Sequence, residues 1–341
     1  MIKKERKILE NIHFRVNKKI LRKKGKCYVS NCKSNAIKSH SFHKKGILNS
    51  LANSNGIVYH TNLPELNPFS DNTPLDRYIM ETHVNDAGTF YGFCNHHDTS
   101  LFLPIENEKK LFEDIKAYIF LHAYRGFAYT HQYELRVREY NEECLKQVKN
   151  NPKILEQTKE KYKIIAENYI LSDDIVYYEN FKNKAEELFV KPSDTIDLLK
   201  LEKNFKIDYI ELYEDVKFAS TSASTTLSNT NKDVVCIGVI PANHQFKAIF
   251  FVMRLAENKG VDLMVNELKT YKINKEKEKL KNCIQNLIVF SSSNIVISPL
   301  KMEELNHLHQ IDSLLKLHND SINILNGGRV NYRHDYGFSL F

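Results

Sequence analysis

Two short-spaced pairs of cysteine and histidine residues constrain this chain more than any other feature. Cys27 and Cys32 form a Cys-x4-Cys pair, and Cys94 forms a second pair with His97 (Cys-x2-His) or His96 (Cys-x-His). Two such pairs from distant segments close around tetrahedral zinc in Cys3His sites. The 61 intervening residues are tolerable, because the entropic cost of loop closure rises slowly with length. We therefore predict a structural zinc ion held by Cys27, Cys32, Cys94 and either His97 or His96, with three ordinary buried thiols as the alternative.

The residues around the second pair predict a local fold suited to a metal ligand. Residues 90–93 read as a strand that leads into Cys94, and residues 95–102 can form a helix directly after it. Residues 54–86 are rich in Asn, Pro, Gly and Asp, which predicts loops with short strands.

The composition indicates a globular protein. The chain has 341 residues, of which 42% are hydrophobic, enough to fill two or three cores. No run approaches the ~18 apolar residues of a membrane span, and residues 1–7 lack the apolar segment of a signal peptide. We therefore expect a cytoplasmic protein with no membrane partner. The six cysteines do not indicate a disulfide framework, and Cys236 and Cys283 lie in apolar runs typical of a core.

Positive charge is concentrated at one end of the chain. Residues 1–45 contain twelve Lys and three Arg against two Glu, a net charge of +13, which leaves −6 for the rest of a chain whose total is +7. Such a basic segment indicates a surface that faces phosphates, so we expect DNA or RNA as partner. The alternative is a solvated helix over residues 3–24 with an apolar face.

The chain divides into three predicted segments and belongs to the α+β class. Residues 1–106 hold the basic helix and the zinc module, residues 107–192 are helical, and residues 193–341 form an α+β domain. In the last segment, apolar runs predict strands at 207–212, 234–240, 247–254, 286–290 and 295–298. The Ser/Thr/Ala-rich residues 220–228 predict a mobile loop.

The zinc module resembles the zinc-containing HNH endonucleases over residues 20–105. The order of Cys27/Cys32, Ser39-His40, Cys94/His97 and Asp98 matches the first cysteine pair, catalytic strand, second pair and helix of that family. The resemblance implies that His40 activates water as a general base, that Asp98 lies near a catalytic Mg²⁺ or Mn²⁺, and that the zinc is structural.

The sequence departs from the HNH pattern at two points. Ser39 stands where the family has a carboxylate ligand, and no Asn can be assigned to the middle position. The module also resembles treble-clef zinc modules that bind without catalysis, and the whole pattern is similar to uncharacterised bacterial proteins. In these alternatives His40 is a fourth zinc ligand or a structural histidine, and Asp98 caps the helix.

A second resemblance involves Arg125 and His131, whose Arg-x5-His spacing on a predicted helix is similar to the active-site motif of HEPN ribonucleases. The alternative for Arg125 is a structural ion pair with a buried carboxylate or a contact with a helix C-terminus.

Three functions follow as hypotheses. The first is an HNH-like metal-dependent nuclease that acts in defence against phage or mobile DNA. The second is a non-catalytic, zinc-stabilised nucleic-acid-binding or adaptor protein, with a protein partner or a second copy of the chain as a further partner. The third is a HEPN-like ribonuclease.

Overall fold

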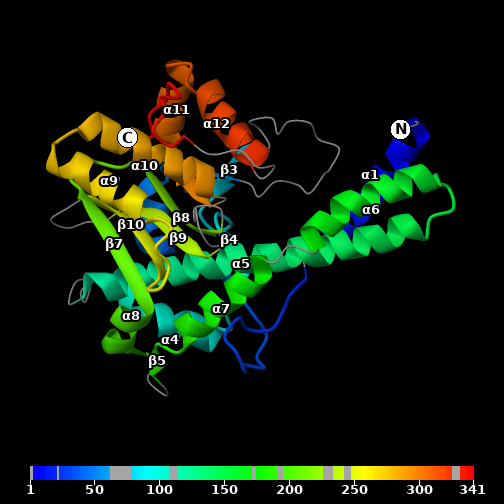
Figure 1. Cartoon of the computed structure of the whole chain (residues 1–341), viewed down its shortest axis with the longest axis horizontal. Coiled ribbons are helices and arrows are strands. Elements are labelled where there is room, and N and C mark those ends of the chain that lie inside the picture. Colours follow the sequence, from blue (N-terminus) through cyan, green and yellow to red (C-terminus); the bar gives the residue numbers. More distant parts are fainter. Residues whose placement is uncertain are drawn as a thin grey trace.

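The computed structural model describes residues 3–20, 23–61, 78–106, 114–170, 174–190, 195–225, 233–241, 247–292, 294–324 and 331–341. Over these residues the chain mixes helices with antiparallel sheet, which confirms the α+β class (Figure 1). The helices are α1 (Lys3–Ile20), η1 (Lys44–Leu48), α2 (Asn49–Leu51), α4 (Asn95–Glu106), α5 (Ile115–Lys149), α6 (Glu156–Ile170), α7 (Asp174–Glu186), α8 (Leu198–Asn204), α9 (Asp262–Ile273), α10 (Lys277–Ser291), α11 (Pro299–His307) and α12 (Ile311–Ile324). The strands are β1 (Lys38–His40), β2 (Ile57–Thr61), β3 (Ile79–His83), β4 (Thr89–Tyr91), β5 (Phe189–Val190), β6 (Thr195–Ile196), β7 (Phe205–Leu212), β8 (Phe218–Ser224), β9 (Val235–Pro241), β10 (Ala248–Leu255) and β11 (Ile295–Ile297).

A seven-stranded antiparallel sheet forms the centre of the molecule, in the order β3-β2-β11-β8-β9-β10-β7. Alternate residues of its strands enter two different cores. Ile249 and Phe251 of β10 pack with residues of α5, whereas Phe250 and Val252 pack with residues of α9 and α10. Because both faces are covered, the inner strands β9 and β10 are apolar almost throughout and do not alternate between apolar and polar residues.

All three predicted segments contribute strands to this sheet or pack against it. Strands β2 and β3 come from the first segment, yet β2 pairs with β11 of the third through Tyr59 and Ile297. Helix α5 of the second segment packs against β8. The smaller pair of β1 and β4 leads into α4, as the sequence predicts. The division at residues 106 and 192 stays a prediction, and these contacts join the segments.

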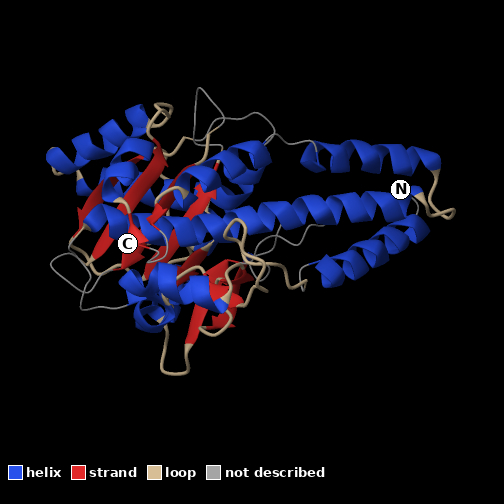
Figure 2. Cartoon of the chain, turned by 90° about the horizontal axis from the view of Figure 1, so that it is seen from below, coloured by secondary structure: helices blue, strands red, loops and turns tan. Residues whose placement is uncertain are grey.

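A helical arm projects from the sheet (Figure 2). It consists of α1, residues 137–149 of α5, and α6, and the N-terminal end of the chain lies at its far end (Figure 1). Its core includes Ile12, Val16 and Ile20 of the predicted apolar face of α1, together with Leu9. No helix in the described part of the chain combines the length and apolar character needed to cross a membrane.

The core of the arm contains one buried histidine, His13. Its Nδ1 contacts the hydroxyl of Tyr140 at short range, its Nε2 lies 3.3 Å from the Tyr162 hydroxyl, and the Cys144 Sγ is 3.8 Å from Nδ1. Burial lowers the pKa of His13 to about 4.

We expect this histidine to make the protein acid-sensitive. Because the folded state binds fewer protons than the unfolded chain, whose histidines have pKa values of about 6.5, stability falls as the pH drops from about 6.5 towards 4. The loss from His13 amounts to about 2 kcal/mol at pH 5. Urea unfolding at pH 5 and pH 7.5 measures this loss of stability. A His13→Gln variant, whose side chain keeps both a hydrogen-bond donor and an acceptor, should lose less stability between these pH values. Equal losses in the two proteins would assign the acid sensitivity to other groups.

The prediction of a mobile loop at residues 220–228 is wrong over its described part. Residues 220–224 belong to β8, a buried inner strand, and residues 226–228 lie outside the described residues. The small polar side chains are satisfied inside the protein: the Ser220 hydroxyl donates to Ser292 Oγ (2.9 Å) and the Thr221 hydroxyl donates to the His122 carbonyl (3.3 Å). Small side chains are needed here because α5 approaches closely, and a Cβ on Gly126 would lie 2.2 Å from Thr221 Oγ1.

The predicted strand at residues 286–290 is also wrong, because these residues lie in α10. A short apolar run does not distinguish a buried helix from a buried strand, and the buried residues Leu280, Ile284 and Leu287 continue at helical spacing. The prediction of strands is confirmed at β7, β9, β10 and β11. Cys236 and Cys283 are core residues, as predicted.

Candidate metal centre

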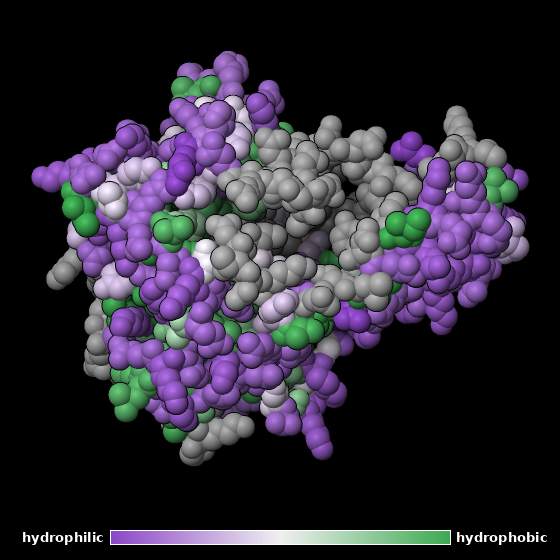
Figure 3. Space-filling view, in the orientation of Figure 1, coloured by the Kyte–Doolittle hydropathy of each residue, from purple (hydrophilic) through white to green (hydrophobic). Residues whose placement is uncertain are grey.

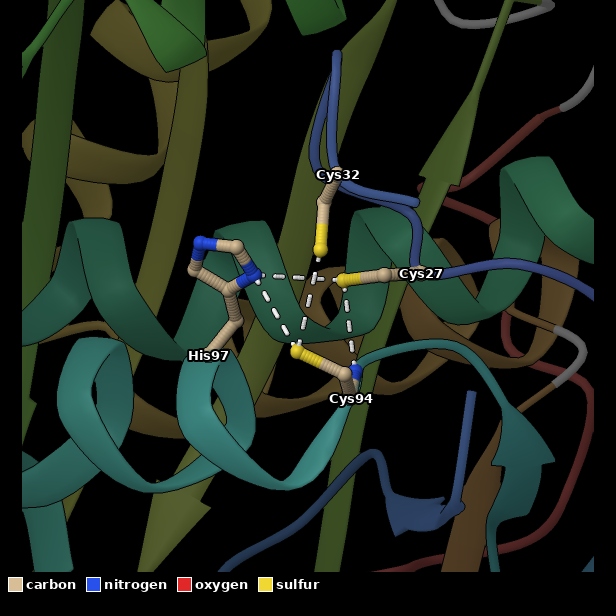
Figure 4. Close-up of side chains that lie close together, drawn as sticks. All are labelled: Cys27, Cys32, Cys94 and His97. Atoms are coloured by element: carbon tan, nitrogen blue, oxygen red, sulfur yellow. Dashed lines mark hydrogen bonds between the residues drawn. The ribbon is translucent and has the colours of Figure 1, made fainter. Parts of the chain in front are cut away.

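The structure brings together the four residues of the two sequence pairs, Cys27, Cys32, Cys94 and His97, beside the start of α4 (Figure 4). Their ligand atoms all lie within 4.8 Å of one another. The Sγ atoms of Cys27 and Cys94 are each 3.3 Å from His97 Nδ1, and the Sγ atoms of Cys32 and Cys94 are 3.9 Å apart. No other group of three or more Cys, His, Asp or Glu residues with metal-binding geometry occurs among the residues that the structure describes.

These separations suit a tetrahedral ion. Zinc bonds of about 2.3 Å to sulfur and about 2.0 Å to nitrogen imply S–S distances of about 3.8 Å and S–N distances of about 3.6 Å. The observed 3.9 Å and 3.3 Å are close to these values, so the cluster could hold a metal such as zinc. His97, which is half-buried, completes the set, whereas the neighbouring His96 is exposed.

Local backbone geometry positions the first pair. Asn31 adopts φ 64°, the left-handed conformation that Asn tolerates better than most residues, and the Cys32 amide closes the turn by donating to the Val29 carbonyl (3.2 Å). The Cys94 amide donates to Cys27 Sγ (3.2 Å), which ties the turn to the start of α4. A loop and a helix N-terminus thus present their ligands toward one point.

The turn between the first two ligands, residues 27–32, is docked on α7 and α5. The Ser30 amide donates to Glu186 Oε1 (3.1 Å), and Lys182 donates to Ser30 Oγ (3.0 Å). The buried Tyr28 hydroxyl lies 2.7 Å from His131 Nδ1. These contacts link the N-terminal segment to the helices beneath the central sheet.

The chemistry of the cluster is that of a closed site. Burial raises the pKa of the Cys27 thiol to about 12, so metal binding must displace a proton that the free thiol holds firmly. Four protein ligands fill a tetrahedral zinc shell and leave no position for water or substrate. Such a centre can hold segments together, but it cannot activate a nucleophile.

His40 lies on β1 and is half-buried. Its Nε2 is 3.1 Å from the Val84 carbonyl oxygen, and burial lowers its pKa, with Arg125 among the charges that act in the same direction. The structure does not bring His40 into the metal cluster, so the alternative of His40 as a zinc ligand is wrong. The neighbouring Ser39 is buried, and its Oγ accepts from the Phe93 amide (3.4 Å).

Asp98 and Glu106, both on α4, are paired with Arg125 of α5. Arg125 Nη2 donates to Asp98 Oδ1 (3.4 Å) and Nη1 donates to Glu106 Oε1 (3.0 Å). The guanidinium also stacks 4.5 Å above the Phe102 ring. The Arg125 side chain is only 3% exposed. Arg125 thus forms an ion pair, as the structural alternative predicts, but its carboxylate partners are partly exposed and not buried, and Glu106 was not anticipated as one of them.

Arg125 and His131 do not converge on α5. His131 is fully buried against Tyr28 and Tyr178, and its Nε2 lies 3.5 Å from Glu179 Oε1. Arg125 faces α4 instead. With both side chains buried and in separate clusters, this geometry offers no shared site for a phosphate.

The fold and the four clustered side chains define an α+β protein with a Cys3His cluster that could hold a metal. Comparison of the chain with protein-family models, curated proteins and solved structures finds no match.

Proposed function

We propose that this chain is a zinc-stabilised nucleic-acid-binding protein that does not hydrolyse its ligand. The observation that supports this proposal most directly is the ion pair of Arg125 with Asp98 and Glu106 beside a closed Cys3His cluster. Zinc is the proposed ion because a tetrahedral thiolate-rich set with one imidazole suits it.

The order of local elements supports a treble-clef-like module. A turn with two cysteines, the paired strands β1 and β4, and a helix that begins with the second ligand pair follow one another along the chain. The same order underlies the resemblance to HNH endonucleases, so the module is compatible with either a catalytic or a binding role.

The charges around Asp98 favour the binding role. A catalytic Mg²⁺ or Mn²⁺ needs carboxylates with free charge, and here a guanidinium is paired with both Asp98 and Glu106 and offsets one of their two negative charges. A cation brought to this place would meet the positive charge of Arg125. Ser39 adds no charged ligand beside His40, so this part of the chain is poorly suited to hold a second ion.

Nucleic acid is the proposed ligand because of the charge distribution. The first 45 residues have a net charge of +13, whereas the whole chain has a net charge of +7. Each phosphate that Lys or Arg neutralises releases counterions, which gives affinity without catalysis and makes it salt-dependent. Adaptor and defence roles stay predictions.

We expect wild type and a His40→Ala variant each to hold one zinc ion, to bind labelled DNA or RNA equally well, and to leave plasmid DNA and RNA uncut in Mg²⁺ or Mn²⁺. Mass spectrometry of the metal, fluorescence anisotropy and gel assays on the same samples measure this. A His96→Ala variant is the matched control for substitution of a histidine beside the metal.

Cleavage by wild type that falls by about 10²-fold or more in His40→Ala, the usual contribution of a general base, would establish the nuclease instead. Absence of any nucleic-acid binding by zinc-loaded wild type would refute the proposed ligand.

A further inference from the structure

The outer face of α1 carries a stripe of exposed residues that belong neither to the Cys3His cluster nor to the central sheet. Lys4, Lys7, Asn11, Phe14 and Lys18 are all exposed. Their spacing of three and four residues places them on one side of the helix, opposite the buried residues of the arm core. We call these five residues the α1 stripe.

The lysines of the α1 stripe differ from two lysines near them, Lys19 and Lys23. Lys19 pairs with Glu143 and Lys23 pairs with Glu139. Lys4, Lys7 and Lys18 have no ion pair with any acid that the structure describes. Their charge is therefore available to an anionic ligand.

A groove of about 460 Å³, lined mainly by polar and charged residues, lies between α1 and the turn from α5 to α6, and it includes Arg15, the residue next to Phe14. Its cationic lining residues are Arg15, Lys146 and Lys153. The single acid in the lining, Glu143, already accepts hydrogen bonds from Lys19 and Gln147. In the view of Figure 3 the projecting end of the molecule is mostly hydrophilic.

Phe14 stands in the middle of this basic face with 71% of its surface exposed. An aromatic ring there has no packing role in the arm. Between Lys7 and Lys18, about 16 Å apart along the helix axis, it lies where a base could stack while the flanking phosphates meet the lysines.

We propose that the α1 stripe and the neighbouring Arg15 bind single-stranded nucleic acid, with Phe14 stacked on an unpaired base and Lys7, Lys18 and Arg15 on the adjacent phosphates. This inference rests on the proposed function and assigns it a surface and a ligand class. Single strands fit better than duplex, because the faces of paired bases are already covered by their neighbours. An anionic membrane fits less well, since the apolar face of α1 is buried in the arm and leaves one aromatic residue to insert.

The test is fluorescence anisotropy of the full zinc-loaded chain with labelled single-stranded DNA, single-stranded RNA and duplex DNA over a range of salt. We expect Phe14→Ala to weaken single-strand binding about tenfold, the loss typical of one stacked base, and Phe14→Tyr to restore it. Ala favours helix, so zinc content and Tm should not change. Substitution of Lys7 and Lys18 by Gln should lower the slope of log affinity against log salt by about 0.7 for each lost phosphate contact.

Matched controls are Ile164→Ala, which removes another exposed apolar side chain of the arm (61% exposed), and Lys272→Gln on α9. If wild type binds single strands but the Phe14 and Lys7/Lys18 variants bind like these controls, the α1 stripe is not the interface and the proposed function stands. If wild type binds no nucleic acid, both proposals are overturned. Tighter binding to duplex than to single strands, or Phe14-dependent binding to anionic vesicles alone, overturns the ligand class.

Discussion

A Cys94→Ser variant is expected to lose its zinc and to unfold at a Tm lower by about 10 °C or more. A serine hydroxyl does not replace a thiolate, and Cys94 lies within 4 Å of two other ligands, at 3.3 Å from His97 Nδ1 and 3.9 Å from Cys32 Sγ. Structural zinc contributes about 10–16 kcal/mol of apparent binding free energy in small modules, which is as large as the whole net stability of a typical domain. A loss of only about 4 kcal/mol would lower Tm by about 10 °C, since 1 kcal/mol corresponds to about 2–4 °C in larger domains.

Metal content by mass spectrometry and thermal unfolding by circular dichroism measure this result. His96→Ala is the control, because His96 is exposed beside the cluster and is not one of the four ligands. It should retain zinc and Tm. A Cys94→Ser protein with a full zinc equivalent, or with the Tm of wild type, would rule out the structural metal centre.

In the Cys94→Ser variant, local unfolding should begin at the turn of residues 27–32, which carries two of the ligands. Residues 27–32 are held by the cluster and by contacts of Ser30 with Glu186 and Lys182 of α7. Without the metal these part-buried hydrogen bonds and the packing of Tyr28 must hold the turn by themselves, so local opening becomes easier. Hydrogen exchange should therefore rise first in residues 27–36 and at the start of α4, and later in the central sheet.

The Cys3His cluster could be predicted from the sequence because its signals are local. Each ligand pair spans a few residues, and the second pair opens a helix, so spacing alone identified Cys27, Cys32 and Cys94. The choice of His97 over His96 required the structure, since neighbouring helical residues differ by about 100° in direction.

The buried strand β8 could not be predicted from its residues. Its Ser, Thr and Ala side chains resemble a loop when they are taken alone, and they are buried only because α5 lies against them at Gly126. The pairing of β2 with β11 is equally non-local, because Tyr59 and Ile297 are far apart in the sequence. Alternation of side chains predicts a strand but does not specify its partner.

The roles of Asp98 and Arg125 also depend on contacts across the chain. The sequence placed Asp98 at a helix start, where a carboxylate is favoured, and gave Arg125 a helical position. Only the packing of α4 on α5 brings them together with Glu106. The catalytic role of Asp98 was predicted from the resemblance to HNH endonucleases. The same local sequence around Asp98 is equally compatible with a structural ion pair.

An Arg125→Met variant is expected to lose about 2–3 kcal/mol of unfolding free energy, less than the about 3–5 kcal/mol that removing one partner of a fully buried ion pair costs. The Arg125 side chain is 3% exposed, and those of Asp98 and Glu106 are 20% and 34% exposed, so their carboxylates would keep only part of their hydration. Urea unfolding measures the loss. Neutralising both acids in the same protein, as Asp98→Asn and Glu106→Gln, should restore most of it, because no unpaired charge then remains. Lys116→Met, which breaks an exposed pair with Glu202, should change stability by less than about 1 kcal/mol.

The same variant tests whether Arg125 takes the place of a catalytic cation. With the guanidinium gone, Asp98 and Glu106 can attract a divalent ion, so Mn²⁺ should raise the Tm of Arg125→Met and leave that of wild type unchanged. Linkage makes the shift depend on Mn²⁺ concentration, which separates binding from a general salt effect measured with an equal ionic strength of NaCl. An equal Mn²⁺ shift in wild type would mean that a divalent ion and the Arg125 ion pairs coexist, and the carboxylates would again be candidates for a nuclease site with His40.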